Sequence, residues 1–411
     1  RHVLELWHGP TSAFKDMALQ CMPLFFSEAV DVMQASGELA DDFLVLVATS
    51  GDTGKAALDG FADRAHTSIV VFYPDGGVSD VQRLQMVTQR GANVGVFGVR
   101  GNFDDCQSAV KAAFNDEAFN AELHETHGLK LSSANSINWG RLLPQIAYYV
   151  SAYADMVAAG GVKPGSPMDV CVPTGNFGNI LGAYYAKLMG VPIGRLLCAS
   201  NENNVLADFI ATGTYDISDR PFVTTPSPSM DILISSNLER LLYHLAGAEA
   251  VRGWMAELAD HRRFTVDKAT FATMRETFLG DWVTNDESLA TIARVYAECG
   301  YLMDAHTAVA WEVAERLRGE DPVLVVSTAH WAKFGADVYR ALTGVAAGVP
   351  LEGEAARMTG LALLDEVRRL APDAAPVPAP LAELAELPER FDEVVDAGRE
   401  GIEAAVREWL G

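Results

Sequence analysis

One lysine near the start of the chain stands where an amine could act as a nucleophile. A glycine–proline break precedes Lys15, and Thr11 or Ser12 can cap a helix that begins beyond them. Apolar residues recur at helical spacing over residues 13–35, so we expect a helix there with Lys15 in its first turn. The positive end of a helix dipole favours a neutral amine, which can form an imine with an aldehyde. The same pattern also fits an ordinary solvated lysine.

Two glycine-containing turns each follow an apolar run and precede a predicted helix. The segment 175–179, Gly-Asn-Phe-Gly-Asn, has backbone N–H groups and a helix start that could bind an anion such as a phosphate. The segment 50–54, Ser-Gly-Asp-Thr-Gly, lies in the same position after an earlier run. Neither has the spacing of a dinucleotide-binding loop or a P-loop. A turn that serves packing remains an alternative for the first segment, and a helix cap remains one for Asp52.

These turns and the Lys15 segment belong to an ordered set of motifs that resembles the threonine synthases, pyridoxal-phosphate enzymes of fold type II. The set comprises residues 8–16, 49–54, 133–138 and 173–179, with a looser match at 328–334. The matches run from Leu4 to Phe334, which is most of the chain. One departure is Trp331, where relatives usually have proline, so the local turn geometry there is open.

The resemblance implies a role for each matching residue. Lys15 would hold pyridoxal 5'-phosphate as an imine and then shuttle protons at the substrate Cα and Cβ. Thr328 would face the pyridine nitrogen as a neutral hydroxyl. The cofactor phosphate would be bound by Gly175, Asn176, Phe177, Gly178 and Asn179. Ser50, Asp52 and Thr53 would cradle the substrate α-carboxylate. The candidates for gripping the substrate phosphate are Ser133, Asn135, Ser136, Asn138, Arg141 and Lys333.

The activity that the resemblance implies is that of a carbon–oxygen lyase acting on phosphates. A threonine synthase converts O-phospho-L-homoserine and water to L-threonine and phosphate, the last step of threonine biosynthesis. A phospholyase that releases phosphate, 2-oxobutyrate and ammonia is an alternative on the same fold, and a non-catalytic homologue is another. The histidines His8, His306 and His330 show no metal-ligand spacing, so we expect no metal and read them as structural hydrogen-bonding residues.

Short apolar runs alternate with helical patterns, which predicts parallel α/β sheets. The fold class we expect is α/β of fold type II, with two open parallel-sheet domains, the active site in the cleft between them, and a C-terminal helical tail. Three runs, 43–48, 168–172 and 322–327, each lead into a hydroxyl residue, namely Thr49, Thr174 and Ser327–Thr328, and their ends could share that cleft. The expected division is 1–42 packing with the large domain, 43–134 as the smaller domain, 135–345 as the large cofactor-binding domain, and 346–411 as a helical extension.

Composition sets the remaining bounds. The 411 residues are 49% hydrophobic and carry a formal net charge of −24, which argues against nucleic acid and anionic membranes as partners. Five cysteines form no C-x-x-C pair, and Cys171 and Cys198 lie in apolar runs as buried thiols, which suits a reducing cytoplasm. We expect a small-molecule substrate and a monomer or homodimer. Because the sequence begins at Arg1 rather than Met, we also expect residues to precede it, with any targeting signal among them.

Overall fold

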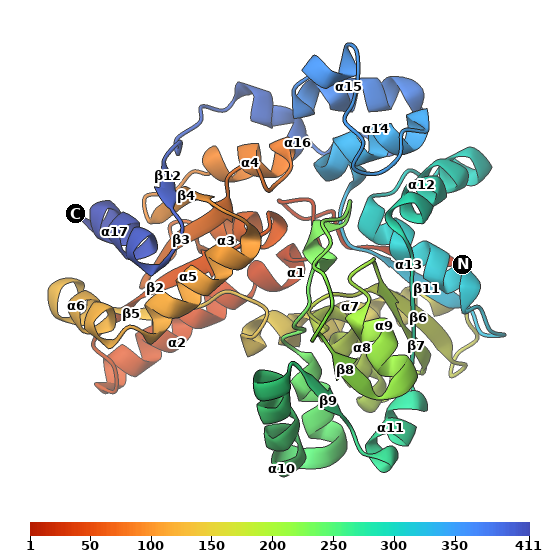
Figure 1. The fold of residues 1–411 in the computed structure, drawn as a ribbon, viewed down its shortest axis with the longest axis horizontal. Coiled ribbons are helices and arrows are strands. Elements are labelled where there is room, and N and C mark those ends of the chain that lie inside the picture. Colours follow the sequence, from red (N-terminus) through yellow and green to blue (C-terminus); the bar gives the residue numbers. More distant parts are fainter. The chain divides into compact units, whose positions relative to one another are not determined.

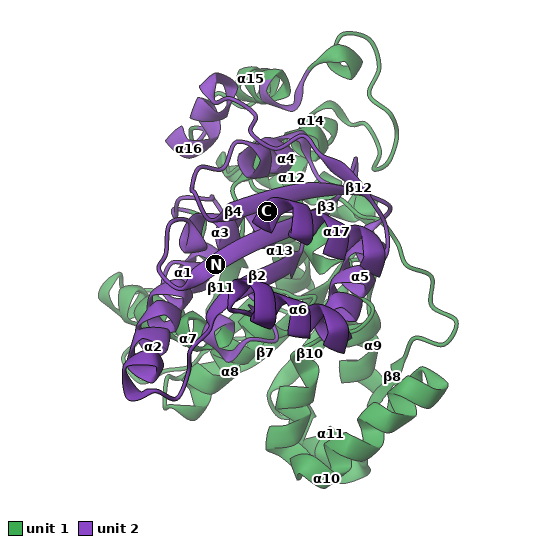
Figure 2. Cartoon of the chain, turned by 90° about the vertical axis from the view of Figure 1, so that its left-hand side faces the viewer, with its two compact units in different colours: residues 1–7, 142–358, 362–376 green, residues 8–141, 359–361, 377–411 purple.

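Ten strands form two five-stranded sheets in which every neighbouring pair runs parallel, as the alternating pattern predicted (Figure 1). The computed structural model describes residues 1–411 and places one sheet in each of two units (Figure 2). Unit 1 comprises residues 1–7, 142–358 and 362–376. Unit 2 comprises residues 8–141, 359–361 and 377–411. The expected α/β class with two parallel sheets is therefore confirmed.

The sheet of unit 2 is buried on both faces. Its strand order is β12 (Val394–Asp396), β4 (Val94–Arg100), β3 (Thr67–Pro74), β2 (Asp42–Ala48) and β5 (Leu129–Ser132). Because side chains alternate along a strand, Leu44 and Leu46 face one hydrophobic cluster, whereas Val45 and Val47 face another. The first cluster includes residues of α5 (Phe103–Asn115), α6 (Glu117–His127) and α17 (Arg399–Leu410). The second includes residues of α2 (Met22–Ser36), α3 (Asp52–Phe61) and α4 (Asp80–Val87).

The sheet of unit 1 has the order β1 (His2–Glu5), β11 (Val323–Ser327), β6 (Met168–Pro173), β7 (Ile193–Ser200) and β10 (Phe278–Trp282). Helix α13 (Ala305–Arg316) contacts β6, β7 and β11, and α9 (Val205–Thr212) contacts β7 and β10. A short antiparallel pair joins β8 (Thr214–Asp216) to β9 (Arg263–Thr265). The other helices of eight or more residues are α7 (Trp139–Ala158), α8 (Gly178–Leu188), α10 (Leu238–His261), α11 (Lys268–Arg275), α12 (Asn285–Cys299), α14 (Gly335–Thr343) and α15 (Gly360–Leu370).

The helix predicted for residues 13–35 is wrong in one important respect. The structure has a four-residue helix, α1 (Asp16–Leu19), and then the separate helix α2. Pro23 lies in the first turn of α2, where a missing backbone N–H is tolerated, so it favours a new helix start. Lys15 is consequently the residue before a short helix rather than part of the first turn of a long one.

The elements that the sequence missed are mostly short strands at sheet edges. Strands β1, β10, β5 and β12 have three to five residues each and are only partly buried, which weakens their apolar pattern. The tail shows the consequence: residues 346–411 were expected to be a helical extension, but β12 pairs with β4 before α17 begins. The three hydroxyl-tipped strands also belong to different sheets, since β6 and β11 are neighbours while β2 lies in the other unit.

The units also divide the chain differently from the expected domains. Residues 8–42 fall in unit 2 together with residues 43–141, although the sequence suggested that 1–42 packs with the large domain. Residues 377–411 complete unit 2 by adding β12 and α17, and are not a separate extension. All five cysteines are free, and Cys171 and Cys198 are buried, as expected. No helix combines the length and apolarity needed to cross a membrane.

Gly60 tests how tightly α3 packs against the segment that carries Lys15. A Cβ atom on Gly60 would lie 2.0 Å from the backbone oxygen of Leu19, at the end of α1. We expect Gly60→Ala to lower the free energy of unfolding by about 2 kcal/mol, because backbone must move to relieve the clash. Chemical denaturation of purified protein measures this change.

Gly253 provides the control for that substitution. It lies inside α10, is exposed, and has no atom within 4 Å of a built Cβ. Gly253→Ala should therefore raise the free energy of unfolding by about 0.5–1 kcal/mol through helix propensity alone. Equal effects of the two substitutions would contradict the close packing inferred at Gly60.

Candidate functional site

The turn that carries Lys15 is held by side-chain hydrogen bonds. The Asp16 carboxylate accepts from the Thr11 N–H at 2.8 Å and from the Thr11 hydroxyl at 2.5 Å. Gly9 leaves room for this carboxylate, since a Cβ there would lie 2.4 Å from Asp16 Oδ2. The Gln85 side chain donates to the Thr11 carbonyl at 3.2 Å, and Ser12 adopts a left-handed φ of 58°. This hydrogen-bonded turn, rather than a long helix, positions the lysine.

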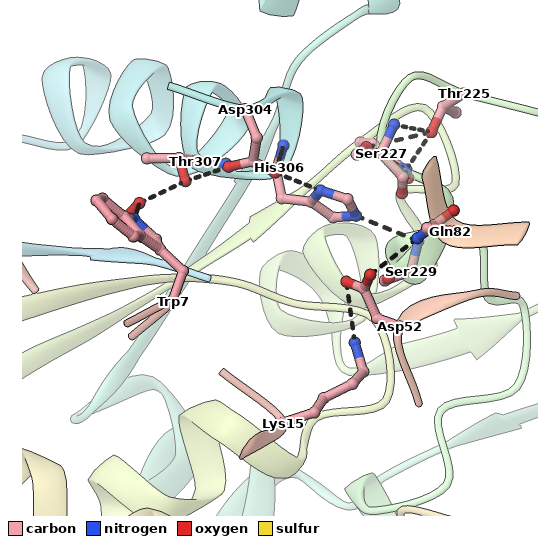
Figure 3. A network of polar contacts seen from close by, with 12 residues as sticks. Trp7, Lys15, Asp52, Gln82, Thr225, Ser227, Ser229, Asp304, His306 and Thr307 are labelled. Carbon is pink, nitrogen blue, oxygen red and sulfur yellow. Dashed lines mark hydrogen bonds and ion pairs between the residues drawn. The ribbon is translucent and has the colours of Figure 1, made fainter. Parts of the chain in front are cut away.

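The amine of Lys15 is buried beside a carboxylate (Figure 3). Its Nζ lies 3.7 Å from Asp52 Oδ2 and 4.7 Å from the centre of the Phe14 ring. Gln82 donates to the other carboxylate oxygen of Asp52 at 2.8 Å, and both Asp52 and Gln82 are almost fully buried. The helix that follows Lys15 has only four residues, so the Asp52 carboxylate, rather than a long helix dipole, is the charged group that faces its amine. Gln82 was missed by sequence reasoning, because nothing in α4 marks it as a partner of Asp52.

The turn at residues 49–54 leaves two hydroxyl groups available. Thr49 Oγ1 accepts from the N–H groups of Gly51 at 3.0 Å and Gly54 at 2.8 Å, so Thr49 stabilises this turn and Asp52 is not the helix cap. Gly51 has a φ of 124°, which L-residues rarely adopt. Ser50 and Thr53 are half-buried, and neither hydroxyl makes a hydrogen bond within the protein. They are free to meet a ligand.

The segment 133–141 uses several of its polar groups to shape the start of α7. Asn135 N–H donates to Ser133 Oγ at 3.2 Å, and the Asn138 side chain donates to the Ser133 carbonyl at 3.0 Å. Arg141 is buried and donates to the Ala134 carbonyl at 2.7 Å. Ser136 is half-buried in the same turn. A role of these residues in binding substrate stays a prediction.

The glycine loop between β6 and α8 presents a row of backbone donors. None of the N–H groups from Gly175 to Asn179 donates a hydrogen bond within the protein. The loop is held instead by its carbonyls: Ser235 Oγ donates to the Gly175 oxygen at 2.8 Å, and the Asn237 side chain donates to the Asn176 oxygen at 2.9 Å. Phe177 begins α8 with a left-handed φ of 62°. Free N–H groups at the start of an 11-residue helix fit a phosphate.

Thr328 and Lys333 follow the neighbouring strand β11. Thr328 is 5% exposed, and its hydroxyl makes no hydrogen bond within the protein. The hydroxyl can therefore accept a hydrogen bond from a ring nitrogen or donate one to it. Lys333 is fully buried in the 3-10 turn Trp331–Phe334. His330 caps that turn by accepting from the Ala332 N–H at 3.1 Å. No group of three or more His, Cys, Asp or Glu side chains could hold a metal ion.

A buried aspartate–histidine pair holds the segment that packs against Gly175 of the glycine loop. Asp304 caps α13, and its carboxylate lies 2.6 Å from His306 Nδ1. His306 Nε2 accepts from the Ser229 N–H at 3.2 Å, so the ring hydrogen is on Nδ1 (Figure 3). A Cβ on Gly175 would lie 3.0 Å from Met230 Cα and 3.2 Å from the Ser229 oxygen. His306 is therefore a structural hydrogen-bonding residue, as the sequence suggested.

A second buried network holds the segment 225–231 against residues 201–203. The Asp231 carboxylate accepts from the side chains of Asn201 at 2.8 Å, Thr225 at 2.6 Å and Asn203 at 3.1 Å. It also accepts from the Thr225 N–H at 3.0 Å. Burial raises the pKa of Asp231 to about 6, despite these donors. The network went unnoticed in the sequence because Asn201 and Asn203 are 30 and 28 residues away from Asp231 in the chain.

Comparison with known proteins places this geometry in context. Residues 4–329 match the family model "Pyridoxal-phosphate dependent enzyme", and residues 307–406 match "Threonine synthase, C-terminal". The crystal structure of a pyridoxal-phosphate-bound threonine synthase from Brucella melitensis is 38% identical, with a TM-score of 0.81 over 99% of this chain and 78% of that one. The yeast threonine synthase structure has the same TM-score and coverage at 35% identity.

Proteins with similar sequences are also named threonine synthases or threonine synthase-like proteins. Threonine synthase-like 1 of Homo sapiens is 46% identical over 348 residues, which cover 83% of this chain and 46% of the human protein. Threonine synthase of Saccharomyces cerevisiae is 40% identical over 366 residues, covering 84% of this chain and 69% of the yeast protein. The chain thus spans about half the length of its human relative.

Asp231 gives a pH test of the buried loop network. A carboxyl group whose pKa is raised on folding adds stability below its unfolded pKa, and that stability is lost as pH rises through the folded value of about 6. The free energy of unfolding, measured as wild type minus Asp231→Asn, should therefore fall by about 1 kcal/mol between pH 5 and pH 8. Urea unfolding at several pH values measures it.

The exposed Asp260 on α10 provides the matched control for this titration. Asp260→Asn, measured in the same way, makes the same chemical change outside the buried network and so separates the effect of burial from that of the substitution. A flat difference for Asp231, or one that rises with pH, would show that its carboxyl group does not titrate as described.

Proposed function

We propose, because the chain belongs to the threonine synthase family of pyridoxal-phosphate-dependent enzymes, that it converts O-phospho-L-homoserine and water to L-threonine and phosphate. The observation that carries this proposal is the buried Lys15 amine beside Asp52, in the turn that matches the cofactor-lysine segment. The proposed enzyme class is a carbon–oxygen lyase that acts on phosphates.

The residues present fit pyridoxal phosphate. Lys15 offers the amine that would hold the cofactor, and the unpaired N–H groups of Gly175 to Asn179 would bind its phosphate. The Thr328 hydroxyl would meet the ring nitrogen as a neutral partner. When bound, the cofactor supplies an electron sink that stabilises negative charge on the substrate carbon.

The protein's own residues would then hold and move protons. Lys15 would accept the proton from the substrate Cα, and Asp52, 3.7 Å from Nζ, would stabilise the ammonium group that results. Gln82 keeps the Asp52 carboxylate in place through its hydrogen bond of 2.8 Å. Burial of all three side chains limits the access of water to the proton.

The substrate-binding residues remain those that the family resemblance suggests. The half-buried hydroxyls of Ser50 and Thr53 would bind the α-carboxylate, with Asp52 beside them. A protein with a net charge of −24 must supply local positive charge to bind a phosphate ester, and Arg141 and Lys333 would do so. The hydrogen-bonding residues at this end of the substrate would be Ser133, Asn135, Ser136 and Asn138.

Substitution of Lys15 tests the proposed mechanism. Lys15→Ala should lose the absorbance band of lysine-bound cofactor and reduce turnover by at least about a thousandfold, because both the attachment point and the proton carrier are removed. The exposed Lys111→Ala, on α5, should keep both properties. Full turnover by the Lys15→Ala protein would refute the mechanism.

The products distinguish this reaction from the alternatives. Pure protein with pyridoxal phosphate and O-phospho-L-homoserine should yield phosphate and threonine in equal amounts. Phosphate together with 2-oxobutyrate and ammonia would instead identify a phospholyase. Cofactor binding without either product would identify a non-catalytic homologue. Parallel assays of phosphate, threonine and 2-oxobutyrate in one reaction mixture give the answer.

We also propose a cytoplasmic location and a monomeric or homodimeric state, with no nucleic-acid or membrane partner. The five free thiols and the acidic net charge support these proposals. Light scattering of the purified chain would measure the oligomeric state directly.

A further inference from the structure

Two tyrosines of α7 converge on one amide next to the glycine loop. The hydroxyls of Tyr148 and Tyr149 each donate to Oδ1 of Asn179 at 2.5 Å. Asn179 is the second residue of α8, and its side-chain Nδ2 is buried with no hydrogen-bond partner. A buried amide donor without a partner is costly, so its presence beside a phosphate-binding loop needs an explanation.

The short distances support the assigned orientation of this amide. An O–H···O bond commonly spans 2.5–3.0 Å, whereas an N–H···O bond is usually longer than 2.7 Å. Burial raises the pKa of Tyr149 well above its ordinary value, so the phenol keeps its proton and remains a donor. Each phenol therefore needs an acceptor, and the shortest hydrogen bond of each is to Oδ1 of Asn179, whereas the other acceptor of Tyr148, Gln145 Oε1, lies at 3.3 Å. The amide nitrogen is left facing away from them.

Close packing of α7 against α8 brings these groups together. A Cβ on Gly182 would lie 3.3 Å from Gln145 Cβ and 3.4 Å from the Gln145 backbone carbonyl. One helical turn away on each helix, Asn179 meets Tyr148, so the two helices run antiparallel at this contact. Tyr148 is 4% and Tyr149 is 0% exposed, which keeps water from competing for Oδ1.

We propose that Tyr148 and Tyr149 are positioning residues that lock the Asn179 amide with its nitrogen as a donor to the cofactor phosphate. This inference rests on the proposed function, because it assumes that the loop at 175–179 binds the phosphate of pyridoxal phosphate. If the amide rotated freely, its oxygen could face the phosphate and repel it. The two phenols prevent that rotation because both of their hydroxyls donate hydrogen bonds to Oδ1.

A comparison of two ligands separates this role from a merely structural one. Pyridoxal carries the same aldehyde as pyridoxal phosphate but has no phosphate. The double variant Tyr148→Phe/Tyr149→Phe should raise the Kd for pyridoxal phosphate about tenfold, the size expected for a lost hydrogen bond to a charged group, and leave that for pyridoxal unchanged. Absorbance titration of the apoprotein gives both constants. In an Asn179→Ala background, the two Tyr→Phe changes should have no further effect.

Tyr153→Phe provides the matched control. Tyr153 is on the same helix, and its hydroxyl donates to the Ser166 carbonyl at 3.0 Å and accepts from the Gly165 N–H at 2.9 Å. Removing that hydroxyl should change neither Kd.

Three results would overturn the inference: equal weakening of both ligands, no weakening of either, or additive effects with Asn179→Ala. Wild-type protein that binds pyridoxal phosphate no more tightly than pyridoxal would also overturn it. Wild-type protein that forms no lysine-bound species with either ligand would instead count against the proposed function itself.

Discussion

The interaction on which the rest of the Lys15 site depends is the buried pair of Lys15 and Asp52. A buried amine is costly to keep unless a partner compensates for lost water, and the carboxylate at 3.7 Å is that partner. Asp52 in turn needs a donor, which Gln82 supplies from α4. The amine is therefore held only while three elements keep their relative positions: the Lys15 turn, the start of α3 and helix α4. The close approach of Gly60 to Leu19 shows how little room this arrangement leaves.

The glycine loop depends on a different constraint, since its backbone donors must remain unpaired. The contacts that hold the loop consequently involve its carbonyls, its side chains and the residues that pack against Gly175. Ser235 and Asn237 bind the carbonyl oxygens, and the turn at Ser229, held by His306, packs against Gly175. The residues around 225–231 are held by the Asp231 network, so a segment whose only regular structure is the 3-10 turn Pro228–Met230 is nonetheless extensively hydrogen-bonded.

Sequence reasoning succeeded where a residue pattern is local and strong. The apolar runs at 43–48 and 168–172 agree with the buried strands β2 and β6 to within a residue. It failed for the edge strands β1 and β10, whose burial is supplied by neighbours distant in the chain. Local pattern cannot show that Gln82 would meet Asp52 or that two tyrosines would meet Asn179, because those pairs are about 30 residues apart.

By itself the sequence determined the α/β class, the family and the lysine, since ordered motifs and buried apolar runs are properties of local residue order. Tertiary structure alone decided what surrounds those motifs. Packing placed Asp52 beside the Lys15 amine, and it surrounded the buried Asp231 carboxylate with hydrogen-bond donors. The physical reason is that burial and the pairing of polar groups depend on contacts between distant segments, and these exist only once the chain has folded.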